Sequence, residues 1–146
     1  MDETPRMIVR AWKLLETELG NNDPELLATL KPGLPKADYW KAVTAWFAAH
    51  DGQVERARPL FDGLRLLSGT ESDRATKKYR GPMVRRDWND EWVVVGRGGP
   101  SLLCWNPANG GVWVVDVHAK PYRKRKRCIG ITQWLSLAAS SLAASG

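Results

Sequence analysis

The sequence predicts a single α+β domain with a central antiparallel β-sheet, flanked by N-terminal helices and a C-terminal helix. Three observations predict this fold. The first half carries apolar residues at helical spacing, residues 91–118 alternate apolar runs with turn residues, and an alanine-rich segment closes the chain. Helices, then a small sheet, then a helix is an order typical of α+β domains. The length of 146 residues fits one domain spanning 1–146.

Two amphipathic helices are expected before the sheet. The first covers residues 5–19, and its apolar face consists of Ile8, Trp12, Leu15 and Leu19. A short helical turn over 24–30 follows, with Asp23 as its N-cap. The second helix covers residues 36–49, and its apolar residues are Tyr39, Val43, Trp46 and Phe47. His50, Asp51 and Gly52 are expected to end it.

A short strand over 60–67 and an exposed helix over 70–79, capped by Ser68 or Thr70, lead into the sheet. The predicted meander has three antiparallel strands, over 91–95, 101–105 and 111–118. In the third strand, one face is formed by Trp113, Val115 and Val117, and the other by Val112, Val114, Asp116 and His118. The last helix covers 131–144, and its inner stripe consists of Ile131, Trp134, Leu135, Ala138 and Leu142.

Eight tryptophans are an unusually large number for a chain of this length. They are scattered over the predicted elements rather than grouped with basic residues, which favours core packing over a stacking platform for single-stranded nucleic acid. We therefore expect four of them to be largely buried, namely Trp12, Trp46, Trp92 and Trp134.

Five consecutive cations stand out in a chain whose net charge is +6, and the rest of the sequence is close to neutral. They are Arg123, Lys124, Arg125, Lys126 and Arg127, and Tyr122 precedes them. The run joins the third predicted strand to the last helix. Three interpretations stay open: a solvated loop or an edge strand protected by charge, a docking patch for an acidic protein, and a contact with nucleic acid.

An acidic stretch, residues 87–91, precedes the first predicted strand of the meander. It lacks the spacing of a calcium-binding loop. It is either a solvated connection or one edge of a binding site. We therefore count Asp87 and Asp90, with Tyr122 and the basic run, as candidate partner-binding residues.

The sequence offers no pattern typical of an enzyme, and we expect neither a catalytic site nor a cofactor. No nucleophile motif is present. The two histidines, His50 and His118, have no cysteine cluster nearby with which to hold a metal. Glycines 96, 98 and 99 lie between two strands, which is typical of a hairpin turn rather than a phosphate loop.

The location expected from the sequence is the cytoplasm. No secretory signal and no apolar run of membrane-spanning length is visible. Cys104 and Cys128 do not form a disulfide framework or a metal motif, which favours a reducing compartment and buried, unreactive thiols.

Several short motifs, taken in order, resemble those of the SUKH superfamily, the Smi/Knr-like proteins. The motifs lie between about residue 8 and residue 142, and they are carried by Trp12, Leu34-Pro35, Tyr39, His50-Asp51-Gly52-Gln53, Trp92, Gly98-Gly99, Leu102-Leu103-Cys104, Pro107, Gly111-Val112 and Trp134-Leu135. The resemblance implies an α+β fold with helices around an antiparallel sheet.

The resemblance also implies a function. Bacterial members of the superfamily are commonly immunity proteins that bind and neutralise a cognate toxin of a polymorphic or contact-dependent secretion system. For this chain the expected partner is such a toxin, with an acidic contact surface. The alternative is a regulatory interaction module that binds nucleic acid or an acidic partner through its basic run.

Overall fold

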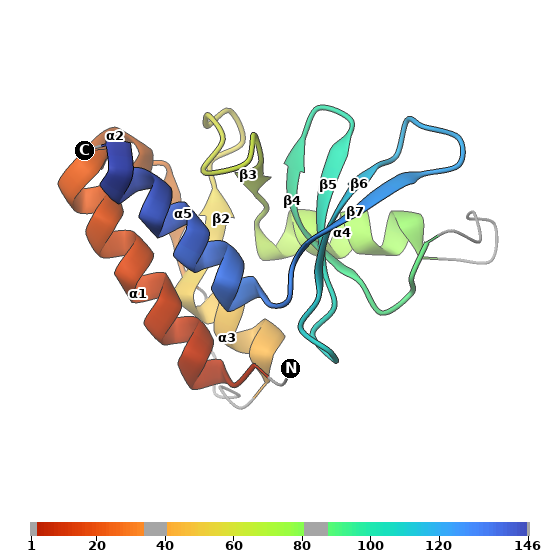
Figure 1. Cartoon of the computed structure of the whole chain (residues 1–146), viewed down its shortest axis with the longest axis horizontal. Coiled ribbons are helices and arrows are strands. Elements are labelled where there is room, and N and C mark those ends of the chain that lie inside the picture. The colour runs from red at the N-terminus through yellow and green to blue at the C-terminus, as the bar shows by residue number, and fades with distance from the viewer. Residues whose placement is uncertain (1–2, 34–40, 81–87, 146) are drawn as a thin grey trace.

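The structure of the protein, a computed structural model, describes residues 3–33, 41–80 and 88–145 (Figure 1). Helices and strands follow one another in the order α1 (Pro5–Asn22), α2 (Pro24–Leu27), β1 (Leu30–Pro32), α3 (Ala42–Ala49), β2 (His50–Gln53), β3 (Arg65–Leu66), α4 (Gly69–Tyr79), β4 (Val93–Gly98), β5 (Ser101–Trp105), β6 (Val112–Asp116), β7 (Arg123–Cys128) and α5 (Ile131–Ser145). The predicted α+β class is confirmed, with helices on both sides of the sheet in sequence.

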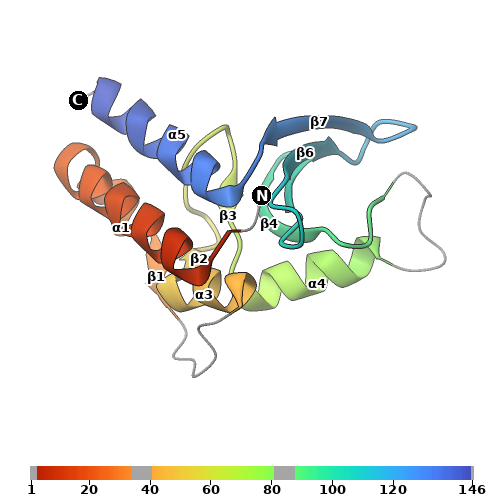
Figure 2. The same cartoon turned by 60° about the horizontal axis from the view of Figure 1, so that its bottom comes forward.

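The main sheet is antiparallel throughout and has the strand order β3-β4-β5-β6-β7. A second, two-stranded sheet pairs β1 with β2. Figure 2 shows α4 running along one face of the main sheet, while α1, α3 and α5 gather beside it. The predicted meander forms the centre of the main sheet, and Gly98 and Ser101 face each other across the predicted hairpin turn.

Several predicted boundaries were wrong. Helix α1 continues to Asn22, three residues beyond the expected end. The expected strand over 60–67 shrinks to β3, because Asp62 and Gly63 take positive φ angles in a tight turn. His50–Gln53 forms strand β2 beside β1 instead of a simple helix end. The first residues of the expected helix 36–49 lie outside the described residues, and α3 is described from Ala42.

Three helix starts are capped as the residue types predict. Thr4 accepts a hydrogen bond from the Met7 amide at 3.2 Å, with Pro5 at the first helical position. The expected cap Asp23 accepts from the Leu26 amide. At α4, Ser68 and Glu71 form a reciprocal capping box. These contacts set where the helices begin.

Two apolar clusters cover the two faces of the main sheet. The larger one lies between the sheet and α1, α3 and α5, and it includes Trp12, Trp46, Trp105 and Trp134. The smaller one lies under α4 and includes Trp88 and Trp92. The four tryptophans expected in the core are no more than 3% exposed, which confirms that prediction. The faces predicted for β6 are also confirmed, since Val112 packs in the larger cluster and Val115 in the smaller.

A buried carboxylate joins the start of the chain to its last helix. The side chain of Glu3 accepts hydrogen bonds from the amides of Ile131 and Thr132, at 3.0 and 2.7 Å, and from Nε1 of Trp105 at 3.3 Å. The negative charge therefore lies at the N-terminus of α5, where unpaired amides and the helix dipole stabilise an anion. Gly130 precedes this helix, and a Cβ atom there would lie 2.8 Å from the carboxylate.

We predict that Glu3→Gln lowers the free energy of unfolding by about 1–3 kcal/mol, because the amide group cannot accept at both oxygen positions and carries no charge. Urea unfolding followed by tryptophan fluorescence measures the change. Glu16→Gln, on the exposed side of α1, is the matched control and should change stability by less than about 0.5 kcal/mol. Equal effects of the two substitutions would contradict the role given to Glu3.

Candidate binding surface

The basic run forms the edge strand β7 and not a connecting loop (Figure 1). It pairs with β6, so that Arg123 faces Asp116, Arg125 faces Val114 and Lys124 faces Val115. The structure therefore decides for an edge strand and against a loop, and it tests neither the docking patch for an acidic protein nor the contact with nucleic acid. Charged side chains on an edge discourage pairing with other chains, and the apolar β6 beside it provides the pairing partner.

Strand alternation divides the cations between the two faces of the sheet. Arg123 and Arg125 share the face of Val114, on the side of the larger apolar cluster, whereas Lys124 and Lys126 share the opposite face with Val115 and Trp113. Arg127 lies at an irregular step between Lys126, which faces Trp113, and Cys128, which faces Val112. Such a bulge re-aims the extra side chain.

Arg127 is held by a clamp that ties β7 to the turn before β3. Its Nε lies 2.9 Å from Oδ2 of Asp62, and its guanidinium stands 5.8 Å from the ring centre of Phe61. Asp62 also accepts from Nε1 of Trp134 at 3.0 Å. The hydrogen bond with Asp62 raises the pKa of Arg127. This cation therefore serves the fold, and it is not available to a partner without breaking the clamp.

The other cations of β7 are exposed. Arg123, Arg125 and Lys126 make no ion pair with any residue that the structure describes. Lys124 is exposed as well. Within the described part of the chain, no further strand pairs with the outer side of β7. The surface thus combines a strand edge that pairs with no other described strand and exposed positive side chains on both of its faces.

The remaining predicted residues are not all gathered at this surface. Tyr122 is half-buried and lies beside an aromatic cluster, with its ring centre 6.4 Å from Trp88 and 6.5 Å from Tyr79. Asp87 lies outside the described residues. Asp90 is exposed in the turn before β4. The start of β4 lies at the same end of the sheet as the end of β7, because Val93, Trp105, Val112 and Cys128 form one row. Asp90 is two residues from Trp88 in sequence, and it is Trp88, not Asp90, that packs against Tyr122.

His50 is a structural residue. It forms the C-cap of α3, and its ring lies between the indoles of Trp12 and Trp46, with ring centres 4.1 and 4.5 Å away. Its Nδ1 accepts from the Gly52 amide at 2.9 Å, and its Nε2 has no hydrogen-bond partner in the described part of the chain. Burial lowers the pKa of His50 to about 3. The neutral ring is therefore part of the core, and the residue also ends α3 as its C-cap.

The other candidate reactive groups also have structural surroundings. His118 is exposed, and its backbone amide, not its ring, bonds to the Asp116 carboxylate. Cys104 and Cys128 are free and buried, as expected. Burial raises the pKa of both thiols, which keeps them protonated. Among the described residues, no group of three or more His, Cys, Asp or Glu side chains is placed to hold a metal ion.

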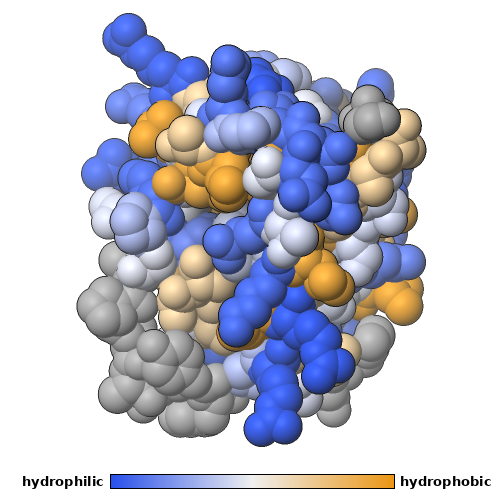
Figure 3. All heavy atoms as spheres, turned by 90° about the vertical axis from the view of Figure 1, so that its left-hand side faces the viewer, coloured by the Kyte–Doolittle hydropathy of each residue, from blue (hydrophilic) through white to orange (hydrophobic). Residues whose placement is uncertain are grey.

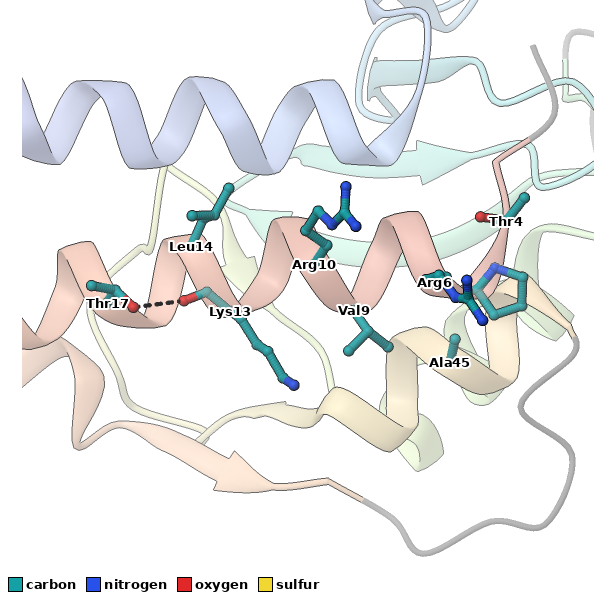
Figure 4. A pocket seen from close by; sticks show the side chains of 9 residues that line it. Thr4, Arg6, Val9, Arg10, Lys13, Leu14, Thr17 and Ala45 are labelled. Atoms are coloured by element: carbon teal, nitrogen blue, oxygen red, sulfur yellow. Dashed lines mark hydrogen bonds between the residues drawn. The ribbon is translucent and has the colours of Figure 1, made fainter.

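The sequence did not indicate a groove of about 730 Å³ along the outer side of α1. The lining residues are Thr4, Pro5, Arg6, Val9, Arg10, Lys13, Leu14, Thr17 and Ala45. In Figure 4, Val9 and Lys13 point toward α3, while Arg10 and Leu14 point toward α5. Figure 3 views the molecule from the side of α1 and α2, where hydrophobic side chains lie in separate patches between hydrophilic ones.

Comparison of the chain with protein-family models and with characterised proteins finds no match in either set. The resemblance to the SUKH superfamily therefore stays a prediction. Among the described helices, none combines the length and the apolar character needed to cross a membrane.

We predict that His50 makes the protein less stable as the pH falls. Its pKa is about 3 in the folded protein, and that of an unfolded histidine is near 6.5, so the unfolded state binds the extra proton between these values. Stability from this group is complete above about pH 6.5 and is lost by up to about 1.4 kcal/mol per pH unit down to pH 3.

The test of this pH dependence measures the unfolding free energies of the wild type and of His50→Asn at several pH values between about 7 and 4. The asparagine can keep an acceptor near the Gly52 amide but does not titrate. The variant is expected to be less stable at neutral pH and to lose less stability on acidification. Parallel pH dependences would contradict the assignment.

Proposed function

We propose that this protein is an immunity protein, which binds a cognate bacterial toxin stoichiometrically and uses the edge strand β7 as its docking surface. The single observation that carries the proposal is the state of β7: three exposed cations without an ion pair to any described residue lie along an unpaired strand edge. In this proposal, the contact surface of the toxin is acidic. The protein acts by covering the toxin, and no catalytic step is part of its role.

Two further observations support a docking role. The strand is preformed, since β6 pairs with every residue of it except Arg127, and the Arg127–Asp62 clamp holds its end. A preformed surface loses less conformational entropy on binding than a flexible loop does. In addition, an acidic partner would be attracted from a distance and oriented by these cations, a role that is compatible with their protecting the strand edge from other chains. The order of motifs shared with SUKH proteins indicates which kind of partner to test first.

The test first determines whether a neighbouring gene encodes a large protein with a toxin-like C-terminal domain, and then expresses that domain in cells to see whether it kills them. We expect co-expression of the wild-type chain to restore growth and to yield a one-to-one complex. The triple variant Arg123→Gln, Arg125→Gln and Lys126→Gln should associate with the domain about tenfold more slowly at low salt, because steering is lost. Dissociation should change less, and the difference should shrink at physiological salt, where screening acts beyond about 8 Å.

The matched control removes three exposed cations elsewhere, through Arg6→Gln, Arg10→Gln and Lys13→Gln on α1. It has the same net charge as the β7 variant. Equal slowing by both triple variants would mean that overall charge, and not β7, attracts the partner. Failure of the wild-type chain to protect cells or to bind the domain would overturn the proposed function, and tight binding to a DNA duplex that depends on β7 would replace it with the nucleic-acid alternative.

A further inference from the structure

A second cationic site lies between α4 and the β3–β4 end of the sheet. It is a pocket of about 220 Å³ lined by Arg65, Leu67, Glu71, Arg74, Ala75, Lys78, Tyr79, Arg97 and Leu102. Four cations and one carboxylate surround it, so its lining carries three net positive charges. Residues from β3, α4, β4 and β5 contribute to it, although only the fold brings them together.

Two like-charge pairs meet at this pocket. Arg65 and Arg97 face each other directly across β3 and β4. Arg74 and Lys78 are one helical turn apart on α4. Like charges directly opposite on strands, or four residues apart on a helix, each destabilise a protein by a few tenths of a kcal/mol. The isolated chain gains nothing from this arrangement, which points to a negative group from outside.

The carboxylate in the pocket neutralises only one of these four cations, Arg65. Glu71 is bound to Arg65, with Nη2 to Oε2 at 2.8 Å and Nη1 to Oε1 at 3.2 Å, and it also caps α4. The hydrogen bond from Arg65 lowers the pKa of Glu71 to about 2, so the carboxylate is charged. Arg65 is therefore occupied. Arg74, Lys78 and Arg97 are exposed and make no ion pair with any side chain in the described ranges.

The neighbouring face of α4 shows the contrast. Asp73 precedes Lys77 by one helical turn, and the two form an ion pair in which Nζ lies 3.0 Å from Oδ2. Outside the pocket, this helix thus balances its lysine with a carboxylate. On the pocket side, Arg74 and Lys78 are not balanced.

The floor of the pocket is apolar and fixed. Leu67 and Leu102 are at most 3% exposed and belong to the cluster under α4. Tyr79 forms one wall, and its ring stacks on Trp88 with centres 5.1 Å apart, so its position is set. A ligand would therefore meet the Tyr79 ring, the small exposed parts of Leu67 and Leu102, and three cations without an ion pair, of which Lys78 lies 5.4 Å from the centre of the Tyr79 ring.

We infer that this pocket binds a phosphomonoester, with the phosphate held by Arg74, Lys78 and Arg97 and a small organic part against Leu67, Leu102 and Tyr79. A phosphomonoester carries about −1.5 to −2 charges at pH 7, which matches three free cations better than the single charge of a carboxylate does. Arginine guanidinium groups pair with phosphate oxygens through two hydrogen bonds at once. This inference is independent of the docking role of β7, since none of these residues belongs to that strand.

Phenyl phosphate is the probe, titrated into the full chain by isothermal calorimetry at about pH 7.5, where its phosphate is mainly dianionic. Phenyl sulfate has the same shape and one negative charge. We expect one-to-one binding of phenyl phosphate and at least about tenfold weaker binding of phenyl sulfate. Arg97→Gln and Arg74→Gln should each weaken phenyl phosphate binding by about tenfold, as the loss of a charge-assisted hydrogen bond predicts. Arg74→Gln, on an exposed helix position, keeps the test valid if Arg97→Gln affects folding.

Lys77→Gln is the matched control, because it removes a cation from the same helix outside the pocket, and it should change the affinity by less than about twofold. No binding of phenyl phosphate would overturn the inference. So would equal affinity for phenyl sulfate, or equal weakening by Lys77→Gln and Arg97→Gln. A short DNA duplex that displaces the probe, with all three variants weakened alike, would show a general polyanion surface instead of this pocket.

Discussion

The position of α5 depends on one buried carboxylate. Glu3 lies at the very start of the described chain and binds the first amides of α5 as well as the indole of Trp105 in β5. Because these contacts need close approach, the residue before the helix is Gly130. The connection from β7 to α5 is only two residues long, Ile129 and Gly130. Fixing the first turn of α5 therefore also fixes where the edge strand ends, and the exposed cations of β7 depend on a contact buried far from them in sequence.

Local sequence patterns were sufficient to predict the parts of the fold that depend on local physics. Helix faces, the Ser68 cap, the glycine hairpin and the alternating faces of β6 follow from spacing and residue type, and all are present. The sequence left residues 123–127 open between a solvated loop and an edge strand, because five cations show no apolar alternation. Pairing with β6 decides it, and that is a tertiary interaction. Strand β2 also depends on a tertiary interaction. Its sequence resembles a helix end, and pairing with β1 makes it a strand.

The candidate sites divide in the same way. The basic run was visible in the sequence, but the role of Arg127 was not, since Asp62 is 65 residues away and reaches it only through a turn with a positive φ angle. The cationic pocket was also invisible. Arg65 and Arg97 are ordinary isolated cations in the sequence, and only strand register places them opposite each other. The spacing of Arg74 and Lys78, four residues apart, is visible in the sequence. It does not predict a pocket, because the strands that complete the lining are brought there only by the fold.

The net charge of the sequence does not show which charged side chains are paired in the folded protein and which are left exposed. The chain outside the basic run is nearly neutral, yet its described ion pairs place several carboxylates in structural contacts. Asp23 binds Arg58, Asp62 binds Arg127 and Glu71 binds Arg65, in each case joining separate elements. Each such contact uses one cation and one anion and leaves the net charge unchanged, so the excess of positive charge falls on other side chains, among them the exposed Arg74, Arg97, Arg123 and Arg125. One row of the sheet, Arg65, Arg97, Leu102, Val115 and Lys124, runs from the pocket to β7. Cations thus stand at both ends of a row whose centre, Leu102 and Val115, is apolar and packs in one cluster with Ala75 and Tyr79 of α4.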